Sequence, residues 1–191
     1  DSYLFALSLP TFIAGLVSSM LSYEIVPRLV ACESDIQYRN QYMASILSVV
    51  AILSVAIIIS GQVFAILQIQ LLPRNSPIKN QENLRHLIDL TWVIGAFQII
   101  QGCVTAMLNV LRRYLAASAL ALLPYIGMIS LLLFYGPGVG IFVLPLGMLI
   151  GTVTAVFLGL YLLRIRSLLL PLHKVLWLEM RQLAFRSPYT A

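Results

Sequence analysis

The sequence predicts an all-α protein, a polytopic bundle of about five transmembrane helices, and two observations carry that prediction. Of its 191 residues 60% are hydrophobic and only 10% are charged, whereas a soluble domain carries about 25% charged residues. Uncharged runs occupy 2–23, 40–73, 90–111 and 114–163. Because one span needs about 20 apolar residues, these runs hold five spans, the last run holding two. A soluble enzyme, a nucleic-acid binder and a disordered tail are therefore disfavoured.

The first two spans are long. The first is predicted over about 2–26, with Pro10 inside it, where the missing N–H and the ring should kink the helix. The second covers about 42–72 and must tilt or extend beyond the bilayer at that length. A cluster of helix-breaking residues, 73–77, follows it.

The last three spans are separated by short connections. The third is predicted over about 86–111 and the fourth over about 114–135. The fourth should end at an uncharged tight turn, Gly136-Pro137-Gly138. The fifth then covers about 139–163, so the transmembrane bundle occupies 1–166.

The remaining residues have a different pattern. Leucines alternate with charged residues over 167–186, which predicts an amphipathic helix at the cytoplasmic interface. Residues 187–191 are interpreted as the start of a further span. The chain opens with Asp1 instead of Met, and we interpret it as a fragment of a longer protein.

The basic residues predict the orientation. Nine of the twelve Lys and Arg residues fall on one side of the predicted spans: Arg28, Arg39, Arg112, Arg113, Arg164, Arg166, Lys174, Arg181 and Arg186. The other side has Arg74, Lys79 and Arg85. Since cytoplasmic loops carry the excess of Lys and Arg, the first side should be cytoplasmic.

A polar stripe lies on one face of the third span. Its members recur at steps of three and four residues: Thr91, Gly95, Gln98, Gln101, Thr105 and Asn109. An unpaired amide in lipid is costly, so the stripe must face other helices or a wet cavity. Two interpretations stay open. The stripe either holds the bundle together by interhelical hydrogen bonds, or lines a cavity that hydrogen-bonds a sugar or a headgroup.

Small residues form a ridge along the fifth span, at strict intervals of four: Gly147, Gly151, Ala155 and Gly159. Such a ridge lets another backbone approach closely. It predicts tight packing on a neighbouring span and no contact with substrate.

Glu24 is an acidic residue in the first span that is a candidate for ion coupling. Arg28 follows at i+4, which favours an ion pair at the interface. The alternative is an ion-coupling carboxylate beside the Pro10 kink, since desolvation would let it titrate. We find no catalytic motif and no ligand spacing for a metal or cofactor, so a membrane enzyme is disfavoured.

Short motifs, taken in chain order, resemble the MurJ (MviN) lipid II flippase family. Asp1-x-x-x-x-Ala6-x-x-Leu9-Pro10, followed by Val26-Pro27, resembles its second transmembrane helix. Ala106-x-Leu108-Asn109-x-x-x-Arg113-Tyr114 is similar to its stretch between helices four and five. Gly140-Ile141 with Leu144-x-x-Gly147-x-x-x-Gly151 is similar to its sixth helix.

This resemblance implies a partial N-terminal lobe of a MATE-like exporter fold, which faces a second lobe of the same protein across a cavity. It implies a flippase for lipid II or a related polyprenyl-pyrophosphate glycan in the bacterial inner membrane, working by alternating access among membrane lipids. The resemblance carries the family's site residues onto Asp1, Asn109 and Arg113. With the stripe, the candidate substrate-binding residues are Asp1, Gln98, Gln101, Thr105, Asn109 and Arg113.

One departure from the family affects the site. In many members the Leu-Pro is followed by a pair of arginines that can meet a pyrophosphate, whereas this chain has Ala14 and Gly15 there. Two alternatives to a lipid-linked glycan flippase follow. One is a cation-coupled small-molecule exporter of the same superfamily, and the other is a membrane assembly protein that transports nothing.

Overall fold

The computed structural model describes residues 2–31, 36–70, 84–139 and 142–163. In these residues the chain forms five long helices: α1 Ser2–Ala31, α2 Ile36–Gln70, α3 Leu84–Val110, α4 Tyr114–Val139 and α5 Val143–Leu163. Each is long and apolar enough to cross a membrane. The predicted all-α bundle with five spans is therefore confirmed, and the chain is a multi-pass membrane protein. The interface helix expected at 167–186 and the start of a further span at 187–191 lie outside the described residues.

The helices do not end where the apolar runs end. Both α1, which continues to Ala31, and α2, which begins at Ile36, extend beyond the predicted spans, because hydropathy marks only the part that lies in lipid. The turn expected at Gly136-Pro137-Gly138 is wrong, since α4 continues through these residues to Val139. In an apolar environment the backbone keeps its hydrogen bonds within the helix, so glycine and proline are tolerated there.

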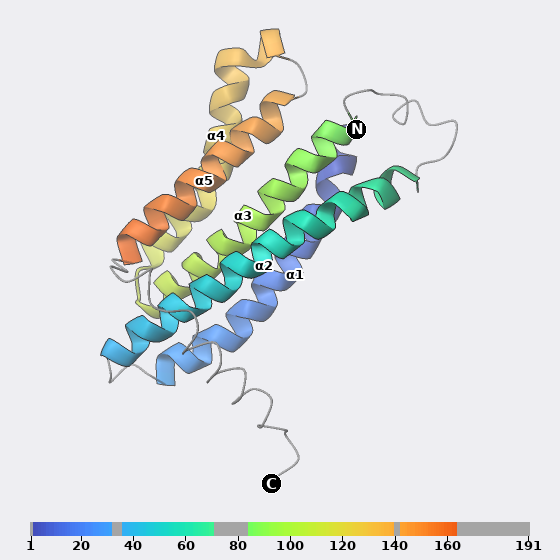
Figure 1. The fold of residues 1–191 in the computed structure, drawn as a ribbon. Coiled ribbons are helices and arrows are strands. Elements are labelled where there is room, and N and C mark those ends of the chain that lie inside the picture. The colour runs from blue at the N-terminus through green and yellow to red at the C-terminus, as the bar shows by residue number, and fades with distance from the viewer. Residues whose placement is uncertain (1, 32–35, 71–83, 140–141, 164–191) are drawn as a thin grey trace.

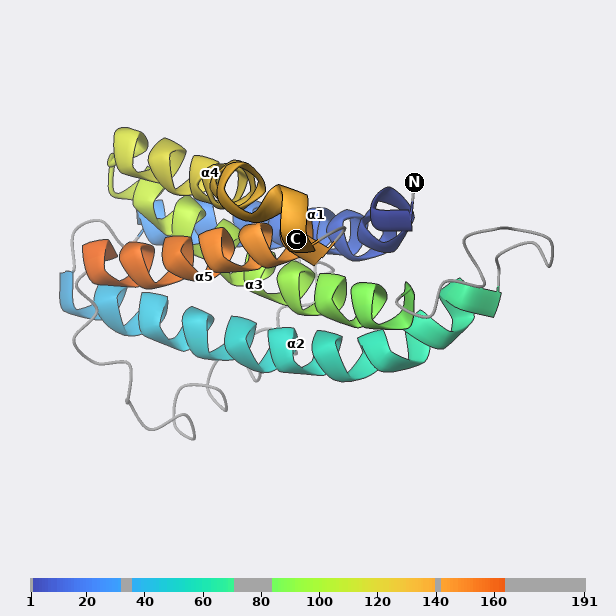
Figure 2. The ribbon, with the colours of Figure 1, turned by 90° about the horizontal axis from the view of Figure 1, so that it is seen from above.

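The centre of the bundle is α3. It packs against all four other helices, with α1 and α2 along one side and the α4–α5 pair along the other (Figures 1 and 2). Inside the bundle 56% of the apolar window of α3 is buried, against 17% for α1 and for α4. Of the polar stripe predicted on this span, Thr91, Gly95 and Gln101 are buried between helices, while Gln98, Thr105 and Asn109 are partly or fully exposed.

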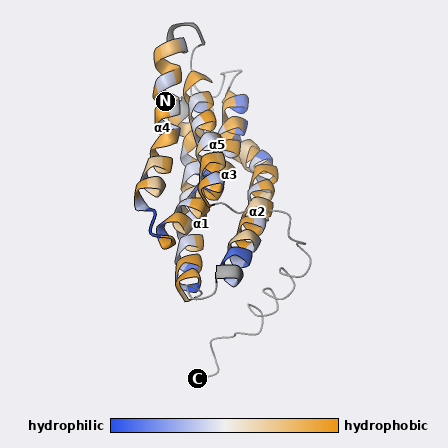
Figure 3. Ribbon diagram, turned by 90° about the vertical axis from the view of Figure 1, so that its left-hand side faces the viewer, coloured by the Kyte–Doolittle hydropathy of each residue, from blue (hydrophilic) through white to orange (hydrophobic). Residues whose placement is uncertain are grey.

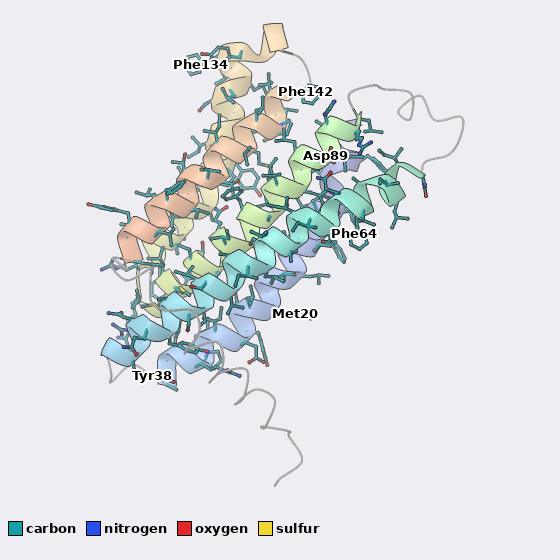
Figure 4. All side chains as sticks on the ribbon, viewed as in Figure 1. Met20, Tyr38, Phe64, Asp89, Phe134 and Phe142 are labelled. Atoms are coloured by element: carbon teal, nitrogen blue, oxygen red, sulfur yellow. The ribbon has the colours of Figure 1, made fainter. Side chains whose placement is uncertain are left out.

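The outer surface of the bundle is apolar. Hydrophobic residues cover the middle of the helices and hydrophilic ones gather at their ends (Figure 3). Exposed apolar side chains such as Met20 of α1 and Phe134 of α4 point away from the bundle (Figure 4). These surfaces suit the hydrocarbon of a bilayer, where helices associate by close packing and not by a hydrophobic drive.

Successive helices run in opposite directions. The α1–α2 and α3–α4 junctions lie at one end of the bundle, and the α4–α5 junction lies at the other (Figure 1). Arg28, Arg39 and Arg112 accordingly lie at the first end and Arg85 at the second. This is the alternation on which the predicted orientation rests, and the assignment of the first end to the cytoplasm stays a prediction.

Labelling of single cysteines tests that orientation. In a variant without Cys32 and Cys103, we expect Pro137→Cys to react with a membrane-impermeant maleimide in intact cells. Ser34→Cys and Ser167→Cys should react only in inverted vesicles. Labelling of Pro137→Cys from the cytoplasm alone would reverse the assignment.

The glycine ridge of α5 packs on α4, as predicted. A Cβ placed on Gly147 would lie 2.7 Å from the carbonyl oxygen of Gly127, and one on Gly151 would overlap that of Leu123. At Gly159 the same atom would meet the side chain of Val104. The ridge therefore brings the α4 and α5 backbones into direct contact, and the prediction of tight packing is confirmed.

Candidate functional site

A groove runs along α3 between α1 and α4. It consists of three adjoining hollows of about 500, 350 and 340 Å³. The first and second share Gln98, Tyr125 and Met148, and the second and third share Val26 and Asn109. The groove exists because α1 packs mainly on α3 while α4 packs mainly on α5, which leaves the face of α3 between them open.

The upper part of the polar stripe holds α1 to α3. Pro10 has no N–H, so the carbonyl of Ala6 one turn earlier loses its helical donor. The hydroxyl of Thr91 lies 2.9 Å from that Ala6 oxygen and 2.7 Å from the Ile88 oxygen of its own helix, so its single proton is shared between the two carbonyls. Beside this bond, a Cβ on Gly95 would lie 3.1 Å from the Pro10 oxygen. Thr91 and Gly95 therefore serve helix packing, as the first interpretation of the stripe expected.

The same arrangement recurs between α3 and α4. Pro124 leaves the carbonyl of Leu120 without a helical donor. The amide nitrogen of Gln101 donates to the Leu120 oxygen at 2.7 Å, and the Gln101 side chain is buried. Gln101 also lines the second hollow. This glutamine thus compensates a proline on the neighbouring helix while its side chain borders the groove.

Three other members of the stripe line the groove. Gln98 lies where the first and second hollows meet, while Thr105 and Asn109 line the second. Within the described part of the chain the amide of Gln98 makes no hydrogen bond. Its donors and its acceptor are therefore available to a polar group in the groove.

The remaining predicted residues lie elsewhere. Arg113 donates from its guanidinium to the carbonyl of Leu162 at 2.6 Å and so ties the start of α4 to the last described turn of α5. Glu24 forms an exposed ion pair with Arg28 at 3.2 Å and does not line the groove, which favours the ion-pair interpretation. Asp1 lies outside the described residues.

Sequence reasoning missed two arginines. Arg39 of α2 and Arg112, just after α3, line the third hollow. A charge count places them near the membrane edge, but only the packing of four helix ends shows that they share one hollow. Arg112 also has a positive φ of 59°, where the backbone closes α3 with a hydrogen bond from the Arg113 N–H to the Leu108 oxygen at 2.9 Å.

The lining has a simple electrostatic character. In the part of the chain that the structure describes, the first two hollows are lined by apolar side chains with amides, hydroxyls and an exposed tyrosine among them, and by no charged side chain. Among the described lining residues, the charged ones are the two arginines of the third hollow, Arg39 and Arg112. Among the residues that the structure describes, no three His, Cys, Asp or Glu side chains are grouped as metal ligands. The groove can therefore hydrogen-bond an uncharged polar group along its length and attract an anion at one end.

Comparison with known proteins identifies the family. A family model described as "Lipid II flippase MurJ" matches residues 1–186, a range that contains all five helices and the whole groove. No curated protein and no solved structure matched the chain. The match covers nearly the whole sequence, and the chain therefore belongs to the MurJ lipid II flippase family.

Proposed function

We propose that this protein moves a lipid-linked cell-wall precursor across the bacterial inner membrane by alternating access, and that the groove carries the headgroup. The precursor is lipid II or a related polyprenyl-pyrophosphate glycan. The observation that supports this is a groove along the central helix in which amide and hydroxyl groups lie among apolar side chains. A glycan leaving water must replace its lost hydrogen bonds with bonds to protein.

Each polar residue of the groove has a proposed role. Gln98, Thr105 and Asn109 exchange hydrogen bonds with the sugar hydroxyls. The amide oxygen of Gln101 adds an acceptor, while its nitrogen stays on α4. Arg113 is proposed as a positioning residue through its bond to α5, and Asp1 stays a proposed substrate contact on the family resemblance alone. The open side of the groove would face the second lobe that the resemblance implies.

A cation-coupled exporter of small molecules is the less supported alternative. It would need a titrating acid beside the transport path. The described residues that line the groove include no acid, and Glu24 is exposed and paired with Arg28. Movement of a polar headgroup fits this lining better, and transport fits it better than catalysis.

Substitution of Gln98 tests the proposed function. In the full-length protein, Gln98→Leu should reduce complementation of a strain depleted of its own lipid II flippase, at normal protein abundance. Loss of one hydrogen bond to a desolvated polar group costs about 1–3 kcal/mol, or roughly a 5- to 150-fold change in an equilibrium. The matched control is Gln62→Leu, because Gln62 is exposed on α2 outside the groove.

Thiol accessibility provides an independent measurement. Gln98→Cys should react with a water-soluble thiol reagent, whereas Val63→Cys, on the exposed apolar face of α2, should not. Normal abundance with full complementation by Gln98→Leu would contradict the proposed role of the groove. Loss of protein from the membrane would instead assign Gln98 to folding.

A further inference from the structure

Tyr125 of α4 is an aromatic side chain that stands open in the groove. It lines the first and the second hollow, as Gln98 does, and both residues therefore lie where the two hollows meet. The side chain of Tyr125 is 55% exposed. Among the residues that the structure describes, its hydroxyl makes no hydrogen bond and its ring stacks on no other ring. Both the face of the ring and the hydroxyl are therefore open to a ligand.

The depth of Tyr125 is unusual for a tyrosine in a membrane helix. Tyrosine is enriched at the two membrane–water interfaces, where its hydroxyl reaches water. Tyr114 and Tyr135 follow this rule, because they are the two ends of the apolar part of α4. Tyr125 lies midway between them. An anchoring role at the interface does not explain a tyrosine at this depth, and a hydroxyl that faced hydrocarbon there would be unpaired.

Polar groups next to Tyr125 come from the other two walls of the groove. Gln98 lies near the middle of α3, and its amide makes no hydrogen bond within the described part of the chain. Ser18 of α1 lines the first hollow, and its hydroxyl likewise makes none among these residues. A Cβ on Gly102 would lie 2.7 Å from the Ser18 Oγ, so this hydroxyl lies against α3. One open aromatic ring is thus accompanied by a free amide and a free hydroxyl.

The first hollow has room for a ligand beside the ring. Its volume is about 500 Å³, within the range of roughly 300–1,000 Å³ that is common for pockets of small molecules. The α1 wall is low here, since Ala14 and Gly15 are small and a Cβ on Gly15 would meet nothing within 4 Å. The described lining of the first two hollows has no charged side chain. A fitting ligand is therefore neutral, with one apolar face and a polar edge.

We infer that Tyr125 is a platform for one sugar ring of the substrate. A pyranose carries C–H bonds on its faces and hydroxyls around its edge. The C–H bonds pack on the electron-rich face of the phenol ring, while the edge hydroxyls exchange hydrogen bonds with Gln98 and Ser18. The inference rests on the proposed function for the source of the sugar. It assigns the middle of the groove to the glycan part of the substrate.

Saturation-transfer NMR on the purified full-length protein in phospholipid nanodiscs tests the platform. The probe is N,N′-diacetylchitobiose, an uncharged disaccharide, and its titration gives a dissociation constant. The native protein should saturate the ring C–H protons of a sugar more strongly than the N-acetyl methyl protons, because the ring face lies on Tyr125. A neutral peptide of similar size, N-acetyl-trialanine amide, has no such face and should give no transfer.

Two substitutions separate the ring from the hydroxyl. Tyr125→Phe keeps the ring, so the disaccharide should bind within about twofold of the native affinity. Tyr125→Leu removes the ring and should weaken binding at least about threefold, as expected for the loss of a contact with an aromatic face. The matched control is Tyr135→Leu, which replaces an exposed tyrosine of the same helix outside the groove and should bind like the native protein.

Three results would overturn the platform. They are the absence of transfer from the native protein, equal transfer to the peptide, and equal weakening of binding in Tyr125→Phe and Tyr125→Leu. The first is expected if Tyr125 packs on the second lobe instead of a ligand. Since the pattern of saturated protons is measured on the native protein, the inference stays testable even if Tyr125→Leu does not fold.

Complementation separates this inference from the proposed function. Tyr125→Leu should reduce complementation at normal protein abundance, and Tyr125→Phe should not. If no sugar binds while Gln98→Leu reduces complementation, the platform alone is wrong. If the sugar binds with the expected proton pattern while Gln98→Leu and Tyr125→Leu both complement fully, the proposed function alone is wrong.

Discussion

Gly151→Leu is expected to abolish the folded bundle. A Cβ at this position would overlap the carbonyl oxygen of Leu123 and lie 2.7 Å from the Cα of Pro124. Both atoms belong to the backbone of α4, which cannot swing aside as a flexible side chain can. Overpacking of a core typically costs about 1–3 kcal/mol, and here the whole α4–α5 contact must open. The measurement is the yield of monodisperse protein on size exclusion in detergent.

A glycine in open space provides the control. A Cβ on Gly15 would meet nothing within 4 Å, so Gly15→Leu should leave the yield of folded protein unchanged. The yield of folded Gly151→Ala should lie between the yields of Gly151→Leu and Gly15→Leu. If the Gly151→Leu variant were monodisperse and had the same unfolding temperature as the native protein, the ridge would not be what holds the bundle together.

The number of spans and the close contact along the ridge of α5 could be predicted from the sequence, because they depend on composition and on the spacing of small residues. Four uncharged runs, the last long enough for two spans, predict five spans. Small residues at intervals of four predict a close contact on whichever helix lies opposite. Helix ends are different. The apolar run stops near Tyr135, but α4 continues to Val139, since the backbone hydrogen bonds of a helix do not depend on hydropathy.

The site could be predicted only in part. Helical periodicity correctly places the polar stripe on one face of α3, but it cannot show which members face a proline on another helix. Thr91 and Gln101 do so, and Gln98 does not. The hydrogen-bond partner of Arg113, in the last turn of α5, could not be predicted either, because tertiary packing determines it. The local sequence predicts on which face of a helix a residue lies, whereas the tertiary fold determines which residue it contacts.

The compensation of Pro124 by Gln101 predicts a specific coupling between the two residues. Gln101→Met keeps a side chain of similar length but leaves the Leu120 carbonyl without a donor. Pro124→Ala restores the N–H that this carbonyl would accept within α4. The loss in the free energy of unfolding caused by Gln101→Met should therefore be smaller in the Pro124→Ala background. The expected coupling is about 1 kcal/mol, in the range of interhelical hydrogen bonds in membrane proteins.

A double-mutant cycle on the free energy of unfolding in mixed detergent micelles measures this coupling. The cycle cancels whatever else each substitution changes, including the contact of Pro124 with α5. The matched control replaces Gln98 by Met in the same two backgrounds, because the Gln98 amide has no bond to α4. Gln98→Met should be additive with Pro124→Ala. If Gln101→Met is equally additive, the bond to Leu120 contributes nothing to stability, and the Gln101 side chain would be kept for its place in the groove alone.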